Sequence, residues 1–177
     1  LVQDVDANSS TTDIAKYILA EAAAKQDPTS FGGKDLIAML QARQDANGHF
    51  GSDALDETTF VNSHAYAIFA LKAAGAAIPD PAGAVLWLKQ SQQSDGGWGW
   101  GFGSSDPDLT AYALRALHLL NVGANDPAVQ KALNYLQGLQ SDSGAILTGG
   151  QPNIYSTIEV ARALNQYGIK LDKAPWV

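Results

Sequence analysis

The stretch 92-QQSDGGWGWGFGSSDPDLTAYALRAL-117 joins a glycine-rich turn to an apolar segment with helical spacing. Its turn places a glycine four residues after Gln92 and a large apolar residue two further on. The same arrangement occurs in 44-QDANGHF-50 and in 140-QSDSGAI-146, so the copies begin 48 residues apart, at 44, 92 and 140. A fixed period of this length is typical of stacked supersecondary units. The chain is therefore predicted to be a repeat protein.

Each turn lies between two segments with helical spacing. The dipeptides Asp27-Pro28, Asp80-Pro81 and Asp126-Pro127 are helix start signals. Gly75, Gly123 and Gly168 are predicted to end the helices that follow the turns. No segment shows the alternation of a strand. Helices are predicted over 12–25, 34–44, 58–74, 82–93, 108–122, 128–140 and 155–167.

The fold class that follows is all-α, with seven helices arranged as helical hairpins. Residues 1–10 are polar and are expected to be a flexible, trimmed start, left by a removed export signal or by a cut. One repeat domain is expected over 11–177. Its units are expected at about 27–75, 80–123 and 126–168.

Composition excludes several functions. The net charge of −7 argues against binding to nucleic acid or to an anionic membrane. No apolar run approaches the roughly 20 residues that span a bilayer. The chain has no cysteine, so disulfides, thiolate metal ligands and thiol catalysis are excluded.

The Gln-x-x-x-Gly-x-Trp pattern resembles the QW-type repeat of the squalene cyclase and protein prenyltransferase superfamily. The resemblance covers about 36–168 and is strongest at Gln92, Gly96 and Trp98, whereas the outer copies carry Phe50 and Ile146. It implies an α/α toroid, of which this chain would form roughly half a ring. Gln44, Gln92, Gln140 and Trp98 are expected to close the turns rather than to take part in chemistry.

Asp106-Pro107-Asp108-Leu109-Thr110-Ala111 resembles the aspartate-rich motif of class II terpene cyclases. The resemblance implies that Asp108, with Asp106 beside it, donates a proton to an isoprenoid. Leu109 stands where that motif has another carboxylate, and a strong acid needs such partners. The alternative is that Asp108 caps the helix that follows.

Several aromatic side chains are candidates for a ligand-binding cavity that would suit a hydrophobic molecule. Burial in the core is the alternative for this set, and a capping or surface role is the alternative for its histidine. The candidate ligand-binding residues are Trp98, Trp100, Phe102, His64, Tyr66, Tyr112 and Tyr155.

No metal or other cofactor is predicted. The related prenyltransferases hold zinc with aspartate, cysteine and histidine, and this chain lacks the cysteine. The three histidines do not stand at metal-ligand spacing. Asp45, Asn47 and Asp53 faintly resemble a calcium loop, but a polar turn is the simpler interpretation.

Three functions are compatible with these patterns. The first is a non-catalytic ligand-binding or scaffold domain of a secreted or cell-surface bacterial repeat protein, or else of a cytoplasmic one. The second is a class II isoprenoid cyclase-like enzyme that uses Asp108 as general acid. The third is a repeat for protein–protein contact. Expected partners are a hydrophobic or isoprenoid-like molecule, and a second copy or a partner domain that completes the ring.

Overall fold

The computed structural model describes residues 5–6, 8–51, 57, 59–100, 103–170 and 176. Over these residues the protein is helical, with one two-stranded sheet of minimal length, so the all-α prediction is confirmed. Two compact units are present, Leu1–Trp87 and Leu88–Val177. None of the described helices is long and apolar enough to cross a bilayer.

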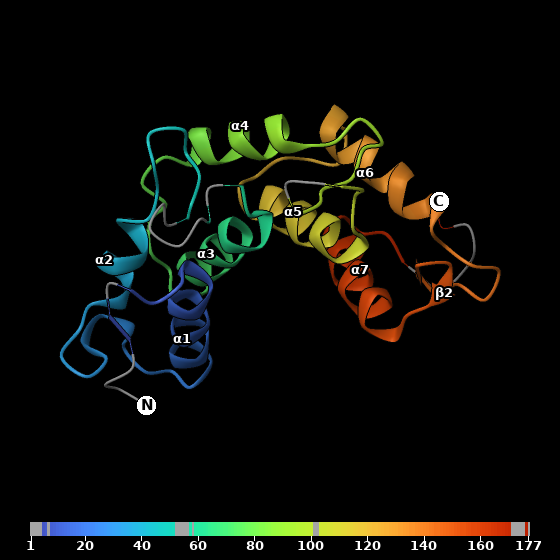
Figure 1. Ribbon diagram of the computed structural model, residues 1–177. Coiled ribbons are helices and arrows are strands. Elements are labelled where there is room, and N and C mark those ends of the chain that lie inside the picture. The colour runs from blue at the N-terminus through green and yellow to red at the C-terminus, as the bar shows by residue number, and fades with distance from the viewer. Residues whose placement is uncertain are drawn as a thin grey trace. The chain divides into compact units, whose positions relative to one another are not determined.

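The first unit is built on two neighbouring thirteen-residue helices, α1 (Thr11–Ala23) and α3 (Val61–Ala73), which lie side by side in Figure 1. A short 3₁₀ helix, η2 (Pro28–Ser30), and α2 (Leu36–Gln41) connect them. Helix α4 (Pro81–Ser91) follows and contains the boundary between the units. The largest fully buried aliphatic side chains of this unit are Ile14, Ile18, Leu36, Leu40, Ile68 and Leu71.

The second unit repeats this plan. Helices α5 (Pro107–Leu119) and α7 (Ile154–Gln166) are again thirteen residues long and pack together, and α6 (Pro127–Gly138) precedes the last turn. Strands β1 (Leu147–Thr148) and β2 (Gln151–Pro152) pair in an antiparallel manner. The sequence did not predict them, because two residues are too few to show alternation.

Most helix termini follow the local signals. Asp126 caps α6 before Pro127, and Gly75 and Gly168 take left-handed φ values of 67° and 74° after α3 and α7. The prediction that Gly123 ends α5 was wrong. Asn121 takes the left-handed conformation there, with φ 64°, because asparagine tolerates this region better than most residues.

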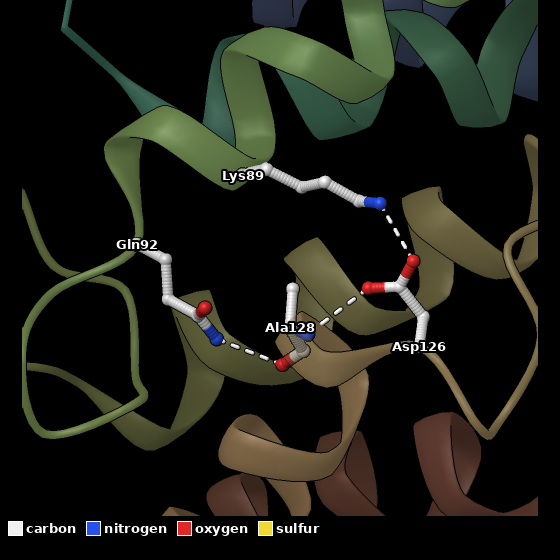
Figure 2. Close-up of polar contacts among 4 residues, drawn as sticks. All are labelled: Lys89, Gln92, Asp126 and Ala128. Carbon is white, nitrogen blue, oxygen red and sulfur yellow. Dashed lines mark hydrogen bonds and ion pairs between the residues drawn. The ribbon is translucent and has the colours of Figure 1, made fainter.

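Within each compact unit, polar contacts join one helical hairpin to the next. They are made by residues near the C-terminal end of the first helix of the hairpin. In the second unit, Lys89 pairs with Asp126 at 2.6 Å, and the Gln92 amide donates to the Ala128 carbonyl oxygen at 2.8 Å (Figure 2). In the first unit, the Gln41 amide donates to the Ala77 carbonyl oxygen at 2.8 Å. These contacts fix where the next hairpin begins.

Candidate functional site

The three glycine turns share one pattern of hydrogen bonds. In each, the amide of the leading glutamine donates to the carbonyl oxygen of the turn glycine, which has a φ of 84° to 94° that favours glycine. The donor–acceptor distances are 2.9 Å for Gln44–Gly48, 2.8 Å for Gln92–Gly96 and 3.4 Å for Gln140–Gly144. The glutamine and the glycine of the motif therefore have a structural task in every copy.

A second bond ties each turn to the helix that follows. The backbone N–H of the large apolar turn residue donates to a side chain at the fourth position of that helix. The pairs are Phe50 N to His64 Nδ1 at 3.0 Å, Trp98 N to Thr110 Oγ1 at 3.0 Å and Ile146 N to Thr157 Oγ1 at 2.9 Å. The fourth position thus supplies an acceptor for a buried N–H, whichever residue type stands there.

Trp98, a predicted ligand-binding residue, is fully buried. Its Nε1–H donates to the Leu88 carbonyl oxygen at 2.8 Å, so its polar atom is satisfied inside the hairpin. Buried tryptophans usually find such a partner. The side chain therefore seals the turn, and a ligand contact by Trp98 stays a prediction.

His64, another predicted ligand-binding residue, is also fully buried. Its Nδ1 accepts from Phe50 and its Nε2 lies 3.2 Å from the Ala84 carbonyl oxygen, an arrangement that requires the proton on Nε2. Burial, reinforced by His49, lowers the pKa of His64 to about 3. The ring is neutral at physiological pH, and both of its nitrogens are engaged.

Two rings that the sequence did not single out as a group surround His64. His49 stacks on it with ring centroids 5.4 Å apart, and Trp87 lies 4.8 Å from it. His49 and Trp87 are themselves 4.1 Å apart. No local pattern links a turn residue, a helix start and a residue of α4, so only the folded chain reveals this cluster.

Asp106 is the cap of α5. Its Oδ1 accepts from the N–H groups of Asp108 and Leu109 at 2.9 and 3.0 Å. The interpretation of Asp108 as the cap was therefore wrong. Proline favours the first helical position, so the cap is the residue before Pro107.

Asp108 lies in the first turn of α5 and is partly buried. Its carboxylate bonds to Ser156 of α7, while its Oδ1 is buried without a hydrogen-bond partner among the described residues. Burial raises the pKa of Asp108, and the nearby carboxylates of Asp106 and Glu159 act in the same direction. The group therefore keeps its proton to a higher pH than an exposed aspartate.

The surroundings of Asp108 include residues that the sequence analysis missed. Ser156 is fully buried and also lies 3.0 Å from Thr148 through its hydroxyl. Glu159 pairs with Arg115 of α5 at 2.9 Å. Near Asp106 rather than Asp108, Tyr135 of α6 has its pKa raised to about 12 by burial and by the charges of Asp95 and Asp106, so its phenol is neutral. No local sequence pattern pairs Asp108 with the start of α7.

The remaining aromatic candidates differ in exposure. Tyr155 and Trp100 expose 76% and 46% of their surface. Tyr66 and Tyr112 are partly buried, and Tyr66 contacts Phe69 and the Lys16 ammonium. Phe102 lies outside the described residues. The structure thus brings Trp98, Trp100, Asp106, Asp108, Tyr112 and Tyr155 into the second unit, and His64 and Tyr66 into the first.

The polar turn around Asp45 is held by its own backbone. The Asp45 Oδ1 accepts from the N–H groups of Asn47 and His49 at 2.8 and 2.9 Å. Asp53 lies outside the described residues. Across the described part of the chain, no three histidine, aspartate or glutamate side chains are grouped so as to hold a metal ion.

Comparison of the sequence with protein-family models and with curated proteins gives no match. The function is therefore inferred from the geometry within each of the two units.

Proposed function

We propose that the chain is a non-catalytic binding or scaffold domain built from toroid-type helical repeats of the squalene cyclase and prenyltransferase kind. One observation carries the proposal. Trp98 is fully buried, whereas Trp100, two residues later in the same turn, exposes 46% of its surface. The repeat motif needs Trp98 to seal the hairpin, and an additional exposed tryptophan is typical of a recognition site.

The ligand class that fits this surface is apolar. The acidic chain disfavours anionic ligands, and an exposed indole offers a flat apolar face to a hydrophobic or isoprenoid-like molecule. The hydrogen bonds of Asp106 support a non-catalytic function, because its carboxylate caps α5.

Titration of the full chain with farnesol, followed by tryptophan fluorescence, tests this proposal. We expect saturable binding, and Trp100→Ala should weaken it about tenfold, which corresponds to about 1.4 kcal/mol. Leu86→Ala is the matched control, because Leu86 is similarly exposed, at 54%, but lies on α4. Unchanged affinity in Trp100→Ala, or no binding by the unaltered chain, refutes the proposal.

A second candidate function is acid catalysis by Asp108 on an isoprenoid alkene. It is favoured by the raised pKa of this carboxyl group and by its buried Oδ1, which lacks a described partner. The full chain should then convert squalene to a cyclic product detectable by mass spectrometry, and Asp108→Asn should abolish the conversion while keeping the fold. Absence of product from the unaltered chain removes this candidate.

We also propose that the protein acts outside the cytoplasm, at or beyond the cell surface. The support is its resemblance to secreted bacterial repeat proteins and the lack of cysteine, which leaves no thiol to oxidise there. Fractionation of cells that express the chain from its natural gene tests the location. Recovery only in the cytoplasmic fraction contradicts it.

A further inference from the structure

An apolar ridge lies uncovered at the start of α7. Ile154, Tyr155 and Ile158 expose 66%, 76% and 43% of their surface. They occupy the first, second and fifth positions of a thirteen-residue helix. Apolar side chains in such a group usually mark a contact surface.

The first and fifth of these positions are buried in the other helices of this length. The fifth position is Ala15 in α1 and Ala111 in α5, and both are fully buried. The first position is Thr11 in α1 and Pro107 in α5, and both are buried as well. The exposure at α7 is therefore a departure from the repeat.

The helix that covers this side of α5 is α7. At the second position of α5, Asp108 bonds to Ser156, and at the ninth position Arg115 pairs with Glu159. Near the end of α5, the His118 ring meets the Tyr167 ring edge-on at 5.1 Å. This side of α5 is thus where the next thirteen-residue helix packs, and within the first unit α3 likewise packs against α1.

The receiving side of that contact is uncovered on α1. On α7 it includes the third, sixth, seventh and tenth positions, where Ser156, Val160 and Ala163 are fully buried and Glu159 takes the ion pair. On α1 the same four positions line a surface hollow of about 310 Å³. Its lining residues are Asp13, Lys16, Tyr17 and Ala20.

We propose that the α7 ridge of one copy packs into the α1 hollow of a second copy, which continues the helix-on-helix contact of the repeat between molecules. Tyr155 and Ile158 are larger than Asp108 and Ala111, which hold the same positions in α5, and the hollow of about 310 Å³ on α1 offers space for larger side chains. This contact is independent of the ligand proposed for Trp100.

The charges at this contact make it weaker than the one between α5 and α7. Arg162 stands at the ninth position of α7, as Arg115 does in α5. Lys16 stands at the sixth position of α1, where α7 has Glu159. In the proposed packing, the positive charges of Arg162 and Lys16 therefore face and repel each other. Lys16→Glu would replace this repulsion by an ion pair with Arg162.

The contact joins two different surfaces, so it is head-to-tail, and such contacts build closed rings or open chains. Light scattering with size-exclusion chromatography should give a mass above the 18.6 kDa of one chain at concentrations up to about 1 mM. Lys16→Glu should tighten the association about fivefold. Ile158→Asp and Ala20→Arg should each abolish it, and both positions are exposed enough to keep the fold.

Mixing the two defective variants gives the decisive result. Ala20→Arg keeps the α7 ridge and Ile158→Asp keeps the α1 hollow, so together they should form a pair that neither forms alone. A single-chain mass for the unaltered protein at the highest concentration overturns the proposal and leaves the ridge to another repeat or a different protein. Association that persists in Ala20→Arg also overturns it, because the ridge would then contact another ridge.

Discussion

The turns 44–50 and 92–98 hold the same backbone geometry with different side chains. Both have a glutamine that bonds the turn glycine, and in both the buried apolar residue donates its N–H to the next helix. In the first turn the acceptor is His64, which lies in a group of aromatic rings. In the second it is Thr110, beside a tryptophan that seals the hairpin. The repeat thus preserves a hydrogen bond rather than a residue type.

The physical reason is the cost of a buried N–H without an acceptor, about 1–3 kcal/mol. Threonine meets the need with its hydroxyl oxygen as acceptor, while the O–H of the same group donates to the Asp106 carbonyl oxygen at 2.7 Å. Histidine meets it with Nδ1, but only while the ring is neutral. The first turn is therefore sensitive to acid at a point where the second is not.

Trp98→Ala should have the largest effect on stability. Removing a fully buried tryptophan leaves a cavity, and such changes cost about 3–5 kcal/mol. Urea unfolding of the full chain measures the loss. Phe50→Ala is the comparison in the first unit, and it should cost about as much, because Phe50 is also fully buried. A loss below about 1 kcal/mol for Trp98→Ala would contradict a sealing role.

The acid sensitivity of the first turn comes next in size. The pKa of His64 is lowered to about 3 from its ordinary value of 6.5, so the unfolded chain binds this proton more readily than the folded one. Its contribution to stability is complete above pH 6.5. It then falls by up to about 1.4 kcal/mol per pH unit as the pH drops from 6.5 toward 3.

His64→Thr, which copies the second turn, should remove this dependence while costing some packing against His49 and Trp87. The measurement is the difference in unfolding free energy between the unaltered chain and the variant from pH 7 to pH 4. His49 and all carboxylates are common to both chains, so their titration largely cancels. A difference that stays constant over this range would show that His64 titrates normally.

Local signals explain most of what the sequence predicted. Proline, aspartate and glycine act within a few residues of a helix end, and the period of the turns is long enough to be unmistakable. The same rule that places caps at Asp27 and Asp126 also selects Asp106, so the assignment of the cap to Asp108 was avoidable. At the end of α5, either Asn121 or Gly123 could take the left-handed conformation that ends the helix. The sequence alone does not decide between them, and the structure gives Asn121.

The surroundings of the candidate residues could not be predicted in this way. The contact between Asp108 and Ser156 joins positions far apart in the chain, and so does the tilted contact between the rings of His49 and Trp87. Such pairs depend on how one helix is rotated against its neighbour. Helical periodicity gives the buried face of each helix but not the partner that it meets.

The glutamines offer a smaller and more graded comparison. Gln44 donates to Gly48 and to the Asp80 carbonyl oxygen, and its Oε1 accepts from Asp80 N at 2.7 Å. Gln92 donates to Gly96 and Ala128. At about 1 kcal/mol for each bond, Gln44→Ala should cost about 3 kcal/mol and Gln92→Ala about 2 kcal/mol in urea unfolding. The reverse order would mean that the bond to Asp80 N contributes little.

The smallest effect concerns the polar link at the end of each first hairpin helix. In the second unit Lys89 pairs with Asp126, and in the first Gln41 bonds the Ala77 carbonyl oxygen. Lys89→Met should cost about 0.2–1 kcal/mol, because the pair lies at the protein surface, where solvent reaches the Lys89 ammonium. At about 1 M salt the charges are screened, so this cost should nearly vanish, whereas the cost of Gln41→Ala should remain.

The same pair has a pH dependence of the same sign as that of His64, but in a lower pH range, because the folded chain lowers the pKa of both groups. The hydrogen bond from Lys89 lowers the pKa of Asp126 below its ordinary value of 3.8. Its contribution is therefore present above that value and is lost as the pH falls through the lowered pKa. In Lys89→Met the Asp126 carboxyl should become protonated at higher pH. NMR titration of that carboxyl measures the change directly. An unchanged titration would mean that the ammonium does not hold this carboxylate in solution, and the link would then rest on Gln92 alone.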